Sequence, residues 1–149
     1  MTSLLSQRGP SSGGSFDAAG DPSQQAVVGR HLLIDLYGCT PDRLSDEFRV
    51  VECLEQAALA AGCVVLGRLS HRFQPQGVAA VVLLAESHAS VHTWPEHRFA
   101  AVDLFFCGAR VDEAAGVARL LEFFKPSNHS IRISGRGMIE ALSDCGGEP

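Results

Sequence analysis

The sequence has little that would suit a nucleic-acid partner, a membrane or a disulfide-stabilised scaffold. Twelve Lys and Arg stand against 17 Asp and Glu, and the formal net charge of -5 leaves no excess of positive charge to neutralise phosphates. No segment approaches the ~20 consecutive apolar residues that a membrane-spanning helix requires. The five cysteines are odd in number and contain no Cys-x-x-Cys pair. We therefore expect a protein of the reducing cytoplasm, without a secretory leader, a nucleic-acid partner or a membrane partner.

The length and composition fit a single folded domain between two tails. The chain has 149 residues, of which 46% are hydrophobic, and this is enough to build one core. Residues 1–28 are rich in Gly, Ser and Pro and predict a disordered N-terminal tail, because such a composition buries too little apolar surface to offset the entropy of ordering. Residues 29–134 carry the regular patterns and predict the folded domain. Residues 135–149 are weakly patterned and predict a flexible C-terminal tail.

The apolar patterns predict an α+β fold. Short apolar runs at 29–38, 63–69, 78–85, 100–106 and 129–134 are typical of strands. Thr40-Pro41 offers a cap and a first helical residue, and apolar residues then recur at helical spacing until Gly62, which predicts one continuous helix. A second helix is expected over 112–124. Two helices with five or six strands indicate a two-layer sandwich, in which both helices cover one face of a mainly antiparallel sheet.

Nearly all reactive side chains gather between residues 86 and 108. They are Ser87, His88, His92, Trp94, Glu96 and Cys107. Val91, Thr93 and Pro95 favour an extended chain here, so His88, Ser90, His92 and Trp94 share one face of a strand and Ala89, Val91 and Thr93 share the other.

Two kinds of site can be weighed on these residues alone. In an extended chain His88 and His92 lie ~13 Å apart and cannot share one zinc ion, even with Cys107 or His71 nearby, so we expect no metal site. A Ser-His-Cys hydrolase is a poor fit because Ser87 has no Gly-x-Ser-x-Gly elbow. Taken one by one, these residues are explained by a solvated strand face, and Cys107 by a small buried hydrophobe.

Five short runs taken together carry a more specific signal. They read GRHLL at 29–33, HRFQPQGV at 71–78, ESH at 86–88, VHTWPE at 91–96 and AAVDLFFCG at 100–108. In combination they resemble the prokaryotic S-adenosylmethionine decarboxylase family, over roughly residues 29–124.

The resemblance implies a self-cleaving proenzyme. It implies cleavage of the Glu86-Ser87 bond and conversion of Ser87 into a pyruvoyl group at the new N-terminus, so that no external cofactor is needed. By the same resemblance, His92 assists the self-cleavage. Cys107 supplies a proton to the substrate carbanion after carbon dioxide has left.

The resemblance also implies the substrate and the assembly. Phe73 and Trp94 match aromatic positions that pack against the adenine of S-adenosylmethionine, and Glu96 matches the carboxylate that accepts the two ribose hydroxyl groups. The resemblance alone implies that the decarboxylated product is the aminopropyl donor for spermidine synthesis. It also implies a homodimer with active sites at its interface. From spacing alone, core packing is the alternative explanation for Phe73 and Trp94.

Three departures from the family pattern leave other functions open. Ala79 replaces a serine linked to positioning of the processing ester, His97-Arg98-Phe99 replaces Tyr-Gly-Tyr, and Phe106 replaces a threonine. A pyruvoyl-dependent decarboxylase of ornithine or arginine is one alternative, since changes near the pocket could switch the substrate. An uncleaved, non-catalytic regulatory homologue is the other.

Overall fold

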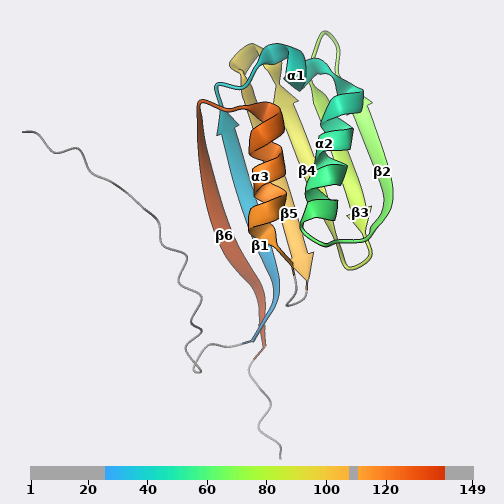
Figure 1. Ribbon diagram of the computed structural model, residues 1–149, viewed down its shortest axis with the longest axis vertical. Helices are drawn as coiled ribbons and strands as arrows, with labels where there is room; N and C mark the ends of the chain where they lie inside the picture. Colours follow the sequence, from blue (N-terminus) through green and yellow to red (C-terminus); the bar gives the residue numbers. More distant parts are fainter. Residues whose placement is uncertain (1–25, 108–110, 140–149) are drawn as a thin grey trace, which may run out of the picture.

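The computed structural model describes residues 26–107 and 111–139, which form one antiparallel sheet covered by helices (Figure 1). The strands are β1 (Ala26–Tyr37), β2 (Val65–Arg72), β3 (Val78–Leu84), β4 (Ser87–Trp94), β5 (Phe99–Cys107) and β6 (Asn128–Ile139). The helices are α1 (Pro41–Ser45), α2 (Glu47–Ala60) and α3 (Glu113–Phe124), and Pro95–His97 forms the single 3₁₀ turn η1. The sheet order is β2-β3-β4-β5-β1-β6, and all neighbours are antiparallel. The expected α+β sandwich is confirmed.

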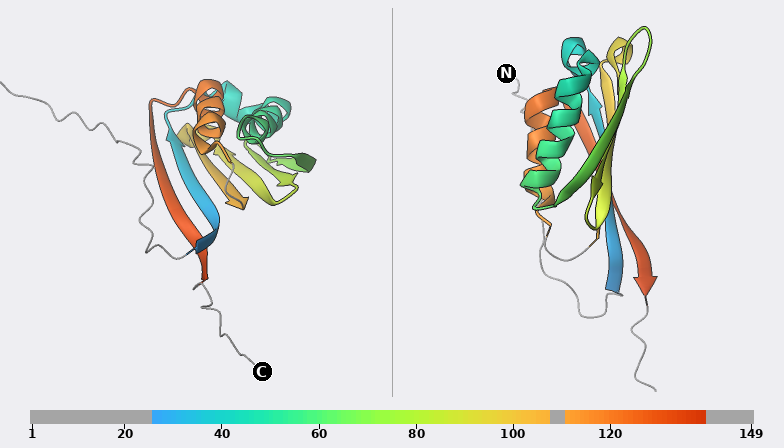
Figure 2. Two further views of the ribbon diagram at one scale, coloured as in Figure 1. Left: turned by 60° about the horizontal axis from the view of Figure 1, so that its bottom comes forward. Right: turned by 90° about the vertical axis from the view of Figure 1, so that its right-hand side faces the viewer.

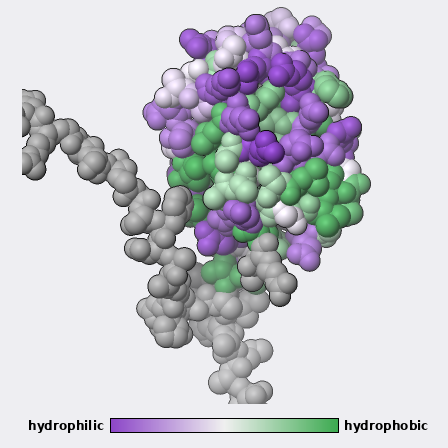
Figure 3. Space-filling view, in the orientation of Figure 1, coloured by the Kyte–Doolittle hydropathy of each residue, from purple (hydrophilic) through white to green (hydrophobic). Residues whose placement is uncertain are grey.

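The described residues form two layers, and among them helices cover only one face of the sheet. The side view in Figure 2 shows α2 and α3 on the same side of the sheet, while the opposite side carries no helix. We call the uncovered side the open face. The outer surface of the helix layer is largely hydrophilic in its upper part (Figure 3), as expected of a surface that meets water.

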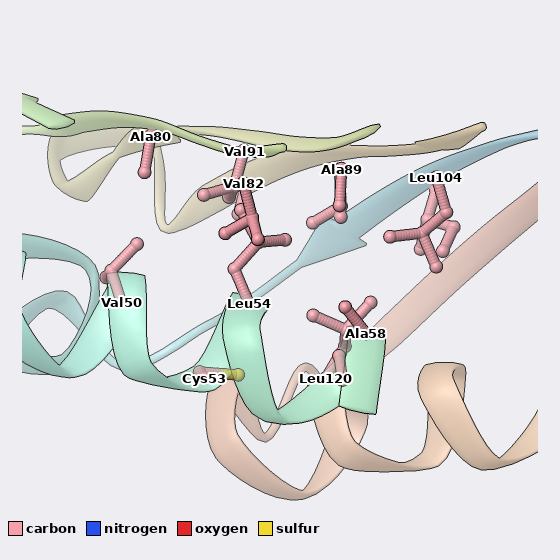
Figure 4. Packing of buried hydrophobic residues seen from close by; sticks show 14 of the residues in the cluster. Val50, Cys53, Leu54, Ala58, Ala80, Val82, Ala89, Val91, Leu104 and Leu120 are labelled. Carbon is pink, nitrogen blue, oxygen red and sulfur yellow. The ribbon is translucent and has the colours of Figure 1, made fainter. Parts of the chain in front are cut away.

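The core forms because strand residues alternate between the two faces. In β5, Ala100, Val102, Leu104 and Phe106 are buried under the helices, and the residues between them are only half-buried. Helix α2 places its apolar stripe against these strands, with Val50, Leu54 and Ala58 directed toward residues such as Val82 and Val91 (Figure 4). Each large aliphatic side chain buried in this way contributes about 1.5–3 kcal/mol.

The continuous helix expected after Thr40 is wrong, because the chain forms two helices that meet at Asp46. Asp46 has an extended conformation (φ -88°, ψ 95°), and its carboxylate accepts a hydrogen bond from the Arg49 backbone N–H at 3.2 Å. It is therefore the N-cap of α2, a position that aspartate favours. The side chain of Thr40, the expected cap, makes no capping hydrogen bond. Apolar spacing misses the break because buried residues lie on both sides of it.

Both ends of the folded domain differ from the boundaries predicted at residues 29 and 134. Strand β1 begins at Ala26 and β6 continues to Ile139, and these two residues are paired with each other. Backbone hydrogen bonding alone extends this two-stranded ladder, so apolar alternation gives no signal for it. Residues 1–25 and 140–149, where the remainder of the predicted tails falls, lie outside the described residues. No helix of the described part is long and apolar enough to cross a bilayer.

Candidate active site

The open face carries the side chains that the sequence analysis placed together. Along β4, Ala89, Val91 and Thr93 are 0%, 0% and 4% exposed, so they belong to the core. The intervening residues of β4 are directed to the open face and are more accessible. The prediction of one core face and one functional face is thus confirmed for this strand.

The Glu86-Ser87 bond lies in the tight turn between β3 and β4. Leu84 and Ser87 are the last paired residues of the hairpin, and Ala85 and Glu86 form the two-residue connection between them. Both connecting residues are exposed, and the Ala85 N–H donates to the Val64 carbonyl oxygen at 2.9 Å. The bond expected to be cleaved therefore lies at the tip of a hairpin whose turn is hydrogen-bonded to the backbone of Val64.

The hydroxyl group of Ser87 is buried and unengaged. Its Oγ atom has no hydrogen-bond partner within the described residues. It borders a cavity of about 450 Å³ that is also lined by Cys107 and by the core residues Leu84 and Phe106. A buried hydroxyl group without a partner is energetically unfavourable, and this one directly follows the Glu86 carbonyl group in the chain.

Cys63 borders the same cavity, although sequence reasoning did not single it out. Burial, and secondarily the nearby Glu86 carboxylate, raises the pKa of the Cys63 thiol, so the thiol remains protonated at neutral pH. We use the name processing end for Cys63, Glu86, Ser87 and Cys107. No motif marks Cys63, because only the fold brings it to the β3–β4 turn.

Four further candidates form a second group, which we name the recognition end: Phe73, His92, Trp94 and Glu96. Phe73 is 41% exposed and Trp94 is 36% exposed, so core packing does not explain these two rings. Trp94 stacks against His92 at 5.9 Å and against Phe99 at 5.4 Å between ring centroids. The Glu96 carboxylate is exposed and accepts a hydrogen bond from Gln76 Nε2 at 3.3 Å.

The recognition end is held by a buried threonine and a tight loop. Thr93 Oγ1 accepts from the Val78 N–H at 2.8 Å and donates to the Leu44 carbonyl at 2.7 Å, which ties β4 to β3 and α1. The Phe73 N–H donates to the Gly77 carbonyl at 2.9 Å. Gly77 has φ +100°, and a Cβ there would lie 2.8 Å from the Thr93 carbonyl oxygen, so only glycine fits.

Arg98 ends this segment in the left-handed region, with φ 51°. Its Nε donates to the Cys39 carbonyl at 3.2 Å, and the Cys39 N–H donates to the Arg98 carbonyl at 2.8 Å. These bonds hold a conformation that glycine adopts more easily, which explains how the chain accommodates arginine there.

The two ends do not meet within one chain. His92 is paired with Ala79 on one side and with Ala101 on the other, five residues along β4 from Ser87. Five residues of a strand span about 17 Å. Moreover, Ser87 lines a cavity among core residues, whereas His92 is on the open face. A base must come within about 3 Å of the proton it takes, so His92 does not reach Ser87 of its own chain.

No three His, Cys, Asp or Glu side chains of residues 26–107 and 111–139 are grouped in a way that could hold a metal ion. His88 and His92 both lie on extended β4, four residues apart. The candidate side chains thus fall into two separated groups.

Comparison with known proteins identifies close relatives. The sequence model of the S-adenosylmethionine decarboxylase family matches residues 30–137. The chain is 41% identical over 123 residues to the S-adenosylmethionine decarboxylase proenzyme of Parasynechococcus marenigrum, covering 83% of this chain and 96% of that protein. It is 45% identical over 115 residues to the proenzyme of Moorella thermoacetica, covering 76% and 91%. The crystal structure of the adenosylmethionine decarboxylase from Aquifex aeolicus superposes with a TM-score of 0.73 at 35% identity, covering 79% of this chain and 98% of that one.

Proposed function

Because the chain belongs to the S-adenosylmethionine decarboxylase family, we propose that it is a self-cleaving proenzyme whose mature form decarboxylates S-adenosylmethionine. The observation that carries the proposal is the setting of the Glu86-Ser87 bond. It lies in a hairpin turn, and the buried, unpartnered Ser87 hydroxyl shares a cavity with Cys107. A nucleophile, its target carbonyl and a thiol are thus placed together.

Cleavage proceeds through an ester. The Ser87 Oγ attacks the Glu86 carbonyl carbon, a C–O bond forms, the C–N bond breaks, and a base moves the hydroxyl proton toward the departing nitrogen. Removal of the Ser87 α-proton then expels the Glu86 carboxylate and leaves dehydroalanine, which water converts to a pyruvoyl group with loss of ammonia. The chain's own residues supply every group except water.

In turnover the pyruvoyl group supplies an electron-withdrawing carbonyl that accepts the electron pair left when carbon dioxide departs. Cys107 is the residue we assign to return a proton to that carbon, because it borders the same cavity as Ser87. A thiol next to the reacting carbon can deliver the proton and takes the place of water there.

The separation of the two ends supports a homodimer. If two open faces stack about a two-fold axis with their strands running in opposite directions, the processing end of one chain lies over the recognition end of its partner. His92 and Trp94 of one chain then lie at the same end of the dimer as Cys107 and the exposed Glu86-Ser87 turn of the other, and cleavage requires this turn to bring the Ser87 hydroxyl group from the core-side cavity to the interface. Half-exposed apolar residues on the open face, such as Tyr37 and Val81, favour its burial in such an interface.

The recognition end suits a nucleoside substrate. Phe73 and Trp94 offer accessible aromatic surfaces for adenine, and the exposed Glu96 carboxylate can accept both ribose hydroxyl groups. Ornithine and arginine have neither a flat base nor a diol, and none of the comparisons favours them. Carbon dioxide release from carboxyl-labelled S-adenosylmethionine is therefore expected to exceed that from ornithine or arginine by at least ~100-fold in kcat/KM, or ~2.7 kcal/mol.

Intact mass spectrometry under denaturing conditions tests self-cleavage. The expected products are residues 1–86 and residues 87–149, the second with a pyruvoyl-blocked N-terminus, and Ser87→Ala is expected to remain one chain. A wild-type preparation that stays whole after prolonged incubation would refute the proposal and favour the regulatory homologue. Cleavage of Ser87→Ala at the same bond would point to ordinary proteolysis.

Mixing two inactive variants tests the shared site. In a dimer of one Ser87→Ala chain and one His92→Ala chain, one site combines Ser87 with His92 and the other has neither. Random pairing should therefore restore about a quarter of the wild-type cleavage, since about half of the dimers are mixed and each has one complete site. Co-expression that restores nothing, although mixed dimers are isolated, contradicts a site shared between chains.

A further inference from the structure

A second imidazole is placed beside His92 by the strand register. His71 of β2 is paired with Ala79 of β3, and Ala79 is paired with His92 of β4. Paired residues of an antiparallel sheet direct their side chains to the same face. Both histidines therefore lie on the open face with one methyl group between them, their Cα atoms about 10 Å apart across two strand spacings.

Each of the two imidazoles contacts one aromatic ring, His71 edge-on and His92 in a stacked arrangement. His71 packs against Phe73 at 5.0 Å between ring centroids, and His92 stacks on Trp94 at 5.9 Å. In each case the aromatic partner is two residues further along the chain, with Phe73 directly after the end of β2 and Trp94 at the end of β4. Both histidines are exposed, and within the described part of the chain neither one has a hydrogen bond or an ion pair to another side chain. Their nitrogen atoms are thus available to a reacting group.

The space between the histidines is a depression of about 420 Å³ lined by His71, Ala79 and His92. Two hydroxyl groups also line it, but both are already engaged. Ser70 donates to Glu47 Oε1 at 2.7 Å, and Ser90 donates to Asp103 Oδ2 at 3.4 Å. Since Ala79 contributes only a methyl group, His71 is the remaining group opposite His92 that can carry a proton.

We propose that His71 is a second proton-transfer residue of self-cleavage, working opposite His92 on the Glu86-Ser87 bond of the partner chain. This rests on the proposed function. When the Ser87 Oγ–carbonyl bond forms and the C–N bond breaks, one imidazole takes the hydroxyl proton and the other gives a proton to the departing nitrogen, so the number of protons is unchanged. Imidazole suits both tasks because it exchanges protons near neutral pH.

The arrangement also explains how the chain functions with alanine at position 79. A hydroxyl group there would lie between the two imidazoles and could relay the proton from one to the other. With only a methyl group present, the two rings border the same space directly and can act on one bond placed between them. Cleavage in this chain therefore depends on His71 more strongly than it would if position 79 were a serine.

The rate of cleavage in purified His71→Phe tests the proposal. Phenylalanine keeps an aromatic ring against Phe73 but carries no proton, so cleavage should slow by about 10²-fold, the usual contribution of one acid or base. The double variant with Ala79→Ser, or free imidazole added to His71→Ala, should restore at least part of the rate. His129→Phe, at an exposed histidine of β6 outside this depression, serves as the matched control and should cleave at the wild-type rate.

Each outcome separates this inference from the proposed function. A wild-type chain that never cleaves refutes the proposed function itself. Normal cleavage in both the wild type and His71→Phe overturns only the role of His71. Slow cleavage that neither serine at 79 nor imidazole improves shows that His71 matters for packing, and this also overturns the proton-transfer role. Thermal melting of each variant establishes that the compared chains are folded.

Discussion

Thr93→Val should weaken the whole recognition end, because one buried hydroxyl group satisfies two backbone groups there. Thr93 is 4% exposed, accepts from the Val78 N–H at 2.8 Å and donates to the Leu44 carbonyl at 2.7 Å. Valine has nearly the same shape, so no cavity forms and the loss isolates the hydrogen bonds. Each backbone group left buried without a partner costs about 1–3 kcal/mol.

The two losses together amount to about 2–6 kcal/mol of the unfolding free energy. A domain of this size has a total stability of only about 5–15 kcal/mol, so the change should be large enough to lower Tm by roughly 10 °C. The effect should reach the site as well, since Thr93 is flanked by His92 and Trp94 on β4.

Urea unfolding monitored by circular dichroism measures this effect. The Ser87→Ala background keeps every molecule as one chain, so that a two-state analysis applies. Thr40→Val is the matched control, because Thr40 is exposed and its side chain caps nothing. It should change stability by less than ~0.5 kcal/mol. A Thr93→Val protein within that same margin of its parent would refute the reasoning.

Three further predictions follow from the structure. Lys125→Gly should stabilise the chain by about 1 kcal/mol in urea unfolding, because Lys125 ends α3 at φ 44°, where glycine is favoured; lower stability would contradict this. Burial raises the pKa of Cys39 to about 11 and that of Cys53 to about 12. The unfolded chain then loses these protons first, so stability should be constant below pH ~9 and fall above it by roughly 1 kcal/mol per pH unit for each thiol. A flat profile between pH 8 and 10.5 would oppose that assignment. Cys107→Ala should cleave normally yet decarboxylate about 10²-fold more slowly, and full turnover would remove Cys107 from the mechanism.

The order of residues along the chain is enough to show which side chains share a face. A strand has a period of two residues, so the alternation from His88 to Trp94 separates core from open face without knowledge of any partner strand. The sequence also contains the combination of short motifs that indicates the family, since these depend on residue identity and spacing alone. The locations of most strands and of α3 followed from the same local periodicity, and the family and the α+β class are confirmed.

The distances between the reactive groups depend on the folded sheet and not on their spacing in the sequence. Ser87, His92 and Cys107 fall within 21 residues of sequence, yet strand register places His92 beside Ala79 and Ala101 and leaves the other two at the opposite end. Register and strand order arise from pairing between distant segments, which local periodicity does not encode. The break at Asp46 escaped detection for a related reason, because the buried residues on both sides hide a cap that depends on backbone geometry. The folded sheet is also what aligns His71 with His92. In the same way, only the fold brings Cys63 to the turn between β3 and β4.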